Sequence, residues 1–259
     1  MNRDQLVNTR QSSVRVETLS LTASQAYLIH SPRPLLVDVG LERDQPRVLR
    51  ALDRHGLSPH DLGAIILTHA HADHAGAIAG IATRSGAPVI AGASDLGVIR
   101  AGGESGSAPV TSLRRLLGRF GLVQSYPPLP PEARVVSVSE ELSLSAFGVH
   151  GRIMPVPGHT SGSIAVVLET GDAFAGDMVI GGYALGRINR TRPVDHFIHS
   201  NRAWNHASLA LLLATQAHTW YLGHGGPVSA TSVRAWLHGL AKTDQQARHI
   251  LKVSPRFRD

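Results

Sequence analysis

Thr68-His69-Ala70-His71-Ala72-Asp73-His74 directly follows the apolar run Ala64-Ile65-Ile66-Leu67. The run predicts a buried strand, and the Ala-rich segment 73–85 predicts a helix. The four potential metal ligands therefore lie on a strand-to-helix turn, where alternating side chains converge from one short piece of backbone. The alternation His-x-His-x-Asp-His is far more specific than a single histidine, and it predicts a metal site.

The ligands of this stretch divide into two pairs. His69 and His71 fit one cation, because their imidazole nitrogens can lie about 2 Å from zinc. Asp73 and His74 begin the next element and can face a second cation. Such a site needs further ligands, for which the candidates are His159, Asp177 and His224. Each of these three stands beside a glycine, which permits the tight turn that a ligand loop needs.

The composition supports an ordinary globular protein that binds metal through nitrogen and oxygen. Hydrophobic residues make up 42% of the 259 residues, and charged residues make up 17%. The sequence has no cysteine, which excludes disulfides and thiolate metal sites and leaves His and carboxylates as ligands. Fifteen histidines is a high number for this length, and imidazole suits zinc, iron and other transition metals.

The net charge of +6 is spread along the chain without a long basic run. Solubility or an anionic small-molecule substrate accounts for it, and no nucleic-acid partner is expected. The segment 1–13 lacks the apolar core of a signal peptide, and no apolar stretch approaches a membrane span. We therefore expect a soluble cytoplasmic protein, without membrane contact, that is compatible with a homo-oligomer.

Alternating sheet and helix patterns predict a layered α/β fold with helices outside. Strands are expected at 14–21, 26–30, 35–39, 64–67, 88–91, 134–138, 142–147, 152–156, 163–168, 173–175 and 219–222. Helices are expected at 45–55, 73–85 and 204–214, with helical spacing again from Val233 to Leu251. Asp38 ends one strand, where it either orients a metal-bound histidine or caps a turn. No linker interrupts the pattern, so 1–259 is expected to be a single domain.

Two long segments, which we call excursions, interrupt the alternation of predicted strands and helices at 94–131 and at 178–199. Each is interpreted as a lid over the site or as a surface insertion, and the first contains an expected short helix at 112–120. The second contains Tyr183, Arg187, Arg190 and Arg192. Tyr183 either donates to the substrate or packs at the loop base. The arginines either bind an anionic substrate or form a solvated loop. The other histidines, including His196 and His199, are interpreted as surface or core residues.

Taken together, these motifs resemble the metallo-β-lactamase-fold hydrolases over nearly the whole chain. The marks are Asp38, the histidine-rich turn at 69–74, Pro157-Gly158-His159-Thr160, Gly176-Asp177 and Gly223-His224-Gly225, all in the order of that family. The resemblance implies a four-layer αββα sandwich. It implies that one cation binds His69, His71 and His159, and that the other binds Asp73, His74 and His224. By the same resemblance, Asp177 bridges the two cations.

The resemblance is nearest to glyoxalase II and the acyl-homoserine lactonases, because the bridging position is Asp and cysteine is absent. The chain ends soon after its C-terminal helix, which weakens a glutathione thioester as substrate. The implied protein is a dinuclear metal-dependent hydrolase with two Zn²⁺, or with iron or manganese. A hydroxide that bridges the metals would attack a small ester, thioester or lactone. Asp73 would orient this hydroxide and shuttle its proton.

Three other functions remain open on the same fold. A phosphodiesterase or nuclease agrees with the positive charge, but it would need a continuous basic stripe that the sequence lacks. A mononuclear iron sulfur dioxygenase would need only one metal, whereas ligands for a second are present. A relative without catalysis that only binds a partner conflicts with the intact ligand set.

Overall fold

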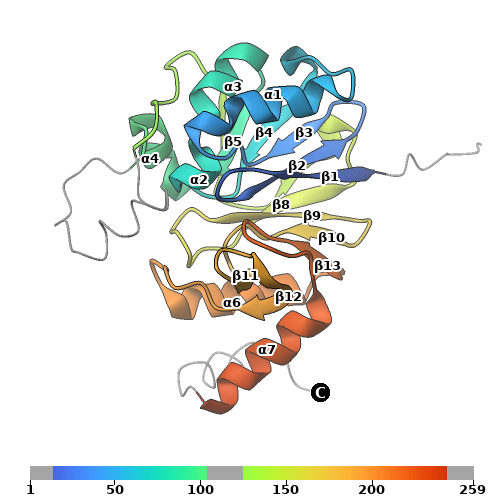
Figure 1. The fold of residues 1–259 in the computed structure, drawn as a ribbon, viewed down its shortest axis with the longest axis vertical. Helices are drawn as coiled ribbons and strands as arrows, with labels where there is room; N and C mark the ends of the chain where they lie inside the picture. Colours follow the sequence, from blue (N-terminus) through green and yellow to red (C-terminus); the bar gives the residue numbers. More distant parts are fainter. Residues whose placement is uncertain (1–13, 104–124, 244–259) are drawn as a thin grey trace, which may run out of the picture.

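Two six-stranded sheets face each other in the structure, a computed structural model that describes residues 14–103 and 125–243 (Figure 1). The first sheet has the order β1-β2-β3-β4-β5-β6, antiparallel from β1 to β3 and parallel from β3 to β6. Its strands are β1 (Arg15–Ser20), β2 (Gln25–His30), β3 (Leu35–Val37), β4 (Ala64–Leu67), β5 (Val89–Gly92) and β6 (Val135–Val138). The ligand turn follows β4, a central strand of this sheet.

The second sheet, built from the later half of the chain, has the order β14-β13-β10-β9-β8-β7. Only β10 and β13 pair in parallel, and the other neighbours are antiparallel. Its strands are β7 (Leu142–Ser143), β8 (Gly151–Pro155), β9 (Ile164–Leu168), β10 (Asp172–Phe174), β13 (Thr219–Tyr221) and β14 (Val228–Ser229). The expected strand at 142–147 is shorter than predicted, because a 3-10 turn, η4 (Ser145–Phe147), follows Leu144.

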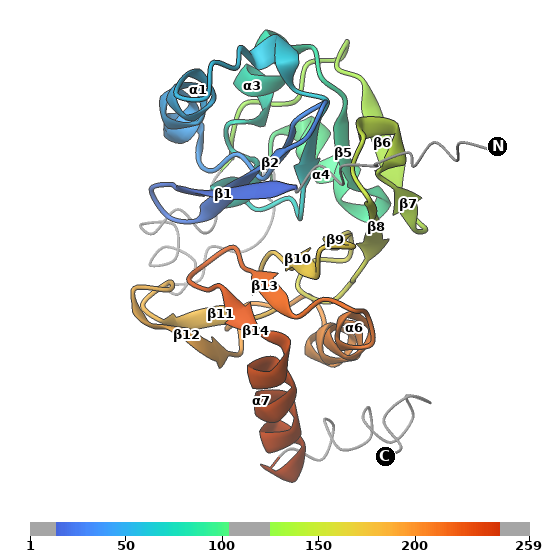
Figure 2. The same cartoon turned by 90° about the vertical axis from the view of Figure 1, so that its right-hand side faces the viewer.

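Helices cover the outer face of each sheet, as Figures 1 and 2 show. The first sheet carries α1 (Gln45–Asp53), α2 (Ala72–Ala75), α3 (Ile78–Ser85) and α4 (Leu96–Ala101), with the 3-10 turns η1 (Glu42–Asp44), η2 (Pro59–Asp61) and η3 (Ala93–Asp95). The second sheet carries α6 (Arg202–Leu213) and α7 (Ala230–Thr243). The expected helix at 112–120 and the end of the C-terminal helix beyond 243 lie outside the described residues.

Three apolar cores fill the spaces between four layers and confirm the predicted αββα sandwich. One core joins the first sheet to α1 and α3, a second lies between the sheets, and a third joins the second sheet to α6 and α7. Strand β4 shows why its sequence is continuously apolar. Because successive side chains point to opposite faces, Ile65 and Leu67 reach the helical core while Ile66 reaches the core between the sheets.

The predicted helix at 73–85 is two helices, because distant segments take the hydrogen bonds that would continue it. The carbonyl of Asp73 accepts a hydrogen bond from the Ser24 hydroxyl, and that of His74 accepts one from the Val39 N–H at 2.8 Å. The Ala77 N–H in turn donates to Gly40 at 3.1 Å. The chain therefore turns after α2, which contains Asp73 and His74, and begins again as α3.

The second excursion contains a β-hairpin, β11 (Ile180–Tyr183) and β12 (Ile188–Val194), paired antiparallel. It forms a separate two-stranded sheet beside the second sheet (Figure 2). Within the described residues, no helix is both long and apolar enough to cross a membrane.

Candidate metal centre

The histidine-rich turn lies between the end of β4 and the start of α2. His71 adopts an extended backbone as the N-cap of α2, and Asp73 and His74 follow within the helix. The ring centroid of His69 lies 4.7 Å from that of His71 and 4.2 Å from that of His74, so the turn brings its histidines together around His69. Except for His71, which is partly buried, these side chains are buried, at 1% exposed or less. The turn thus places four side chains that could bind metal close together, and their assignment as two pairs of ligands stays a prediction.

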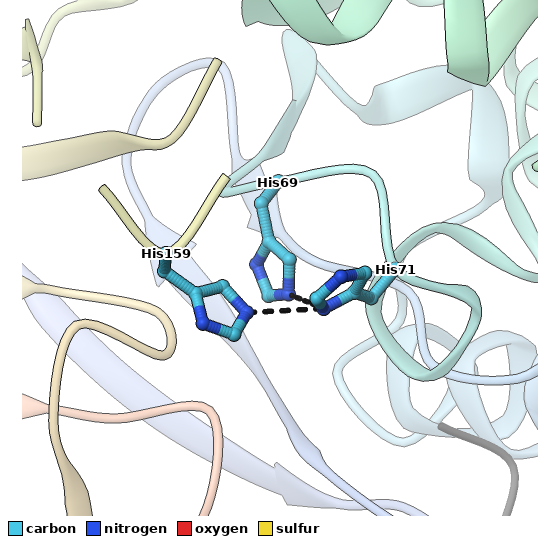
Figure 3. Close-up of side chains that lie close together, drawn as sticks. All are labelled: His69, His71 and His159. Carbon is cyan, nitrogen blue, oxygen red and sulfur yellow. Dashed lines mark hydrogen bonds between the residues drawn. The ribbon is translucent and has the colours of Figure 1, made fainter. Parts of the chain in front are cut away.

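Three imidazoles meet at the first position of the centre (Figure 3). His71 Nδ1 lies 3.1 Å from His69 Nε2 and 3.0 Å from His159 Nε2. Nitrogens that bind one zinc at tetrahedral angles are separated by roughly 3.3 Å. The ring nitrogens are therefore spaced like ligands of a single ion.

His159 reaches this position from the loop after β8. The backbone of Gly158, with φ of 144°, lies so close to α6 that a side chain there would overlap the backbone of Asn205. Only glycine fits between the ligand loop and the helix, and it sets the direction in which His159 points.

The second position is formed by Asp73, His74 and His224, the last of which comes from the loop after β13. Asp73 Oδ2 lies 3.2 Å from His224 Nε2 and 3.8 Å from His74 Nε2. Asp177 lies between the two positions. Its Oδ2 is 3.2 Å from His224 Nε2 and 3.9 Å from His69 Nε2, as a bridging carboxylate requires.

Hydrogen bonds on the far side of the rings decide which nitrogen faces the centre. His74 Nδ1 lies 2.8 Å from the Asp38 carboxylate, and His224 Nδ1 lies 2.9 Å from the carbonyl of Ala23. His159 Nδ1 is likewise 2.9 Å from the carbonyl of Ile198. Each acceptor holds the proton at Nδ1, so the nitrogen that a metal would bind is Nε2, on the side of the centre. Asp38 therefore contacts His74 at the nitrogen that faces away from the centre, and its role in orienting a metal ligand stays a prediction.

The electrostatic environment differs between the two positions. Burial, together with neighbouring histidines, lowers the pKa of His69 and of His159 well below the usual value, so both rings are neutral. At the second position burial opposes the charged form of His224, but Asp177 and Asp73 outweigh it and raise its pKa to about 10.

The residues present fit a pair of metal cations. Within the described chain, Asp73 Oδ2, His74 Nε2, Asp177 Oδ1 and His224 Nε2 are buried without a hydrogen-bond partner. Buried polar atoms normally have a hydrogen-bond partner; these four atoms lack one, and a bound cation would take its place. A cluster of imidazole and carboxylate groups suits zinc and related ions. Neutral imidazoles at one position and two carboxylates at the other supply the ligand chemistry that such cations need.

A cavity of about 1020 Å³ lies beside His224. Its walls include the turn at 20–25 and the β11–β12 hairpin, from which Tyr183, Arg187 and Arg190 line the space. Arg192 is absent from the lining residues, and its guanidinium lies 5.8 Å from the centroid of the Tyr183 ring. The structure thus brings Tyr183, Arg187 and Arg190 to the cavity, whereas Arg192 lies over the Tyr183 ring and does not line the cavity. Tyr183 is 45% exposed.

Two residues of this region, Arg43 and Asp95, escaped the sequence analysis, and a third, His196, was interpreted there as a surface or core residue. Arg43 lines the cavity from η1. Asp95 is buried and accepts hydrogen bonds from Ala70 N at 3.0 Å and from the Thr160 hydroxyl at 2.8 Å, so it ties two ligand loops together. His196 lies inside the centre, with Nε2 3.5 Å from Asp177 Oδ2. Neither Arg43 nor Asp95 stands in a motif. For His196, the sequence offered one indication, which is its position in the excursion at 178–199 directly after Asp177.

The metallo-beta-lactamase superfamily is the family whose sequence model matches this chain, over residues 20–224. The chain belongs to this superfamily, and the matched range runs from Ser20, the last residue of β1, to His224. The resemblance that the motifs indicated is confirmed.

Individual relatives are distant. The chain is 24% identical over 165 residues to the Beta-lactamase-like protein 2 homolog of Drosophila melanogaster, covering 63% of this chain and 49% of the relative. It is 28% identical over 158 residues to a hydroxyacylglutathione hydrolase of Halorhodospira halophila, covering 61% and 45%. The chain thus spans about half the length of the curated relatives it matches.

Among solved structures, a metallo-beta-lactamase of Cronobacter sakazakii superposes with a TM-score of 0.57 and 24% identity. The superposition covers 94% of this chain and 83% of that one, and it shows a shared fold.

Proposed function

We propose that this protein is a dinuclear metal-dependent hydrolase of a small ester, thioester or lactone. The observation that carries the proposal is the convergence of ligands from loops far apart in the chain. Four come from the turn after β4, and the others follow β8, β10 and β13. The far-side hydrogen bonds leave lone pairs aimed inward, which a structural cluster of histidines would not require. A relative named hydroxyacylglutathione hydrolase supports a thioester among the candidates.

The protein side chains have separate roles in this proposal. His69, His71 and His159 would hold one cation, and Asp73, His74 and His224 the other, with Asp177 between them. When bound, the cations supply a water of lowered pKa and positive charge for the developing oxyanion. Asp73 Oδ2, at the edge of the second position, would orient that water and accept its proton.

The cavity beside His224 would receive the substrate. Arg43, Arg187 and Arg190 line it together with apolar side chains such as Ile180 and Phe197. Guanidinium groups pair with carboxylates and phosphates, so the cavity suits a small anionic substrate with an apolar part. Tyr183 on the hairpin is placed to contact the same substrate.

The three cavity arginines also favour a second candidate, a phosphodiesterase acting on a small molecule. Within the described residues, a complete second set of ligands disfavours the mononuclear iron dioxygenase, which would leave Asp73, His74 and His224 without a role. Metal identity, oligomeric state and cellular location stay predictions from the sequence.

Metal content and substrate turnover, measured together, test the proposal. Purified protein is assayed for metals per chain and for cleavage of matched thioesters, lactones, oxyesters and phosphodiesters. We expect about two zinc ions per chain and turnover of at least one carboxylic ester class. Asp177→Ala should lose the bound metal and the turnover, whereas the exposed control His60→Gln should keep both. One iron per chain with thiol-dependent oxygen uptake would contradict the proposal, and cleavage of phosphodiesters alone would favour the second candidate.

A further inference from the structure

His196 lies inside the candidate metal centre without belonging to either expected set of ligands. Its side chain is 3% exposed, and its Nε2 has no hydrogen-bond partner among the described residues. The ring packs edge-on against His159, with centroids 4.7 Å apart, and its centroid is 6.3 Å from that of His224. With Nε2 3.5 Å from Asp177 Oδ2, the ring points between a ligand of the first position and a ligand of the second.

The backbone at Ile198 determines which nitrogen of His196 carries a proton. Ile198 N–H lies 3.0 Å from His196 Nδ1 and can only donate, so Nδ1 must be the acceptor. The Ile198 carbonyl lies 3.0 Å from the same Nδ1 and 2.9 Å from His159 Nδ1, and it can accept two hydrogen bonds. The tautomer of His196 is therefore set by the Ile198 N–H, whose hydrogen would clash with a hydrogen on His196 Nδ1 and not with one on His159 Nδ1. The backbone of Ile198 therefore favours opposite tautomers for the two histidines. His159 Nε2 has a lone pair, and His196 Nε2 has a hydrogen.

His196 lies with Asp177 and His224 in a group whose atoms are close enough to hold a cation. A nitrogen that bears a hydrogen cannot bind a metal, so in this tautomer His196 is not a ligand. It is a donor that points at the space between the two positions. The neighbouring residues Asp195 and Phe197 both line the cavity next to His224. His196 does not line this cavity, and its Nε2 instead faces Asp177. A substrate that extends from the cavity past His224 to Asp177 would reach His196.

Contacts around His196 hold the donor in place before any substrate arrives. Its ring stacks on Phe197 with centroids 4.7 Å apart and planes inclined by 14°. The Asp195 carboxylate accepts from Arg202 Nε at 2.6 Å and lies 3.2 Å from His199 Nε2. These contacts fasten the segment 195–199 to the start of α6, so the position of the donor is fixed by the fold.

We propose that His196 is a catalytic residue whose Nε2–H donates a hydrogen bond to the substrate oxygen on which negative charge develops. The inference rests on the proposed hydrolase function and adds a protein donor to it. Preorganised donors act strongly in sites from which water is excluded, and loss of one lowers kcat by about 10²–10³-fold. His196 would also contact an oxyanion that occupies the same space, such as inorganic phosphate.

Three variants separate a donor from a ligand and from a structural ring. His196→Phe keeps an aromatic ring for stacking but removes the donor, and His196→Gln restores an N–H on a flexible side chain. His60→Gln changes an exposed histidine of η2 and serves as the control. Should His196→Phe fail to fold, His196→Ala takes its place with the same expectations. Each variant is compared with the wild type for metal content, melting temperature, steady-state kinetics, and phosphate affinity of the zinc-loaded protein by calorimetry.

We expect His196→Phe to retain about two metals per chain while kcat falls about 10²-fold and KM changes little. The Kd for phosphate should rise about tenfold, and His196→Gln should recover part of both losses. Loss of a metal ion from folded His196→Phe would make His196 a ligand and overturn the inference. Unchanged kcat and unchanged phosphate affinity would also overturn it. A wild-type protein that cleaves no substrate of the panel would instead count against the proposed function, and phosphate affinity would still decide the role of His196.

Discussion

Asp38 shows how much of the centre depends on one side chain that binds no metal. Its backbone has φ of 59°, in the left-handed region that Asp and Asn tolerate better than most residues. From there the carboxylate accepts Thr68 N and the Thr68 hydroxyl, each at 2.7 Å, as well as His74 Nδ1. It therefore fixes both the ligand turn and the ring orientation of one ligand.

Asp38→Asn should weaken metal binding without unfolding the protein. Asn keeps the backbone conformation, but its amide cannot accept all three hydrogen bonds, so the Nδ1 proton of His74 loses its acceptor. Losing such an outer partner typically lowers metal affinity about 10–100-fold. Zinc affinity is measured by competition with a chelator, and the exposed Asp53→Asn serves as control. Affinity equal to wild type would show that His74 needs no help from Asp38.

Gly223 is a second position where a small change should abolish the site. A methyl group there would overlap Asp177 Oδ1 and the His74 ring. We expect Gly223→Ala to bind less than one metal per chain and to lose at least 10²-fold in turnover, because ligand placement shifts. Gly97→Ala, in open space on α4, should keep full metal content and activity. The test is the metal content per chain of the two purified variants, and equal metal content in both would contradict the prediction for Gly223.

Single functional residues can be predicted from the sequence when they stand together in one short motif. The turn at 69–74 could be predicted because its ligands follow one another on a single strand-to-helix junction. His196 could not, since its tautomer is set by the Ile198 peptide and its burial by packing of 195–199 on α6. A histidine without a motif looks the same in the sequence whether it faces solvent or a metal centre.

Secondary-structure elements were harder to predict where distant segments intervene. The β11–β12 hairpin turns through Ala184 and Leu185, with φ of 51° and 53°. These residue types rarely adopt positive φ, so the usual Gly and Asn signal of a hairpin was weak. The break between α2 and α3 likewise depends on hydrogen bonds from Ser24, Val39 and Gly40, which no local pattern records.

The hairpin should determine substrate charge preference. Arg187 is exposed and lines the cavity, and within the described residues its guanidinium makes no hydrogen bond, whereas Arg190 Nε donates to Gly226 O at 3.1 Å. Arg187→Ala should therefore raise KM for an anionic ester by about tenfold, since a charge-assisted hydrogen bond contributes roughly 1.5–3 kcal/mol. KM for a neutral ester of the same size should not change. Arg50→Ala on α1 is the control, and an equal effect on both esters would contradict charge recognition.

The arrangement of the two sheets followed from the apolar pattern, because buried strands such as β4 read as continuous apolar runs. What the pattern could not show is how the sheets meet. Four of the ligands belong to the first half of the chain, and His159, Asp177 and His224 belong to the second. The candidate centre thus lies where the two halves join, and bound cations would fasten one half to the other.

Removal of metal should therefore destabilise the entire fold rather than one loop. An ion that binds only the folded state stabilises it by about 4 kcal/mol when its free concentration is a thousand times Kd. For a chain of this size, the loss of two such ions, about 8 kcal/mol together, should lower Tm by about 15–30 °C. Calorimetry of the zinc-loaded protein, the chelator-treated and dialysed protein, and the same sample after zinc is restored measures the change. If Tm is the same in all three samples, the cations do not hold the halves together, and the buried carboxylates and imidazoles must satisfy one another without them.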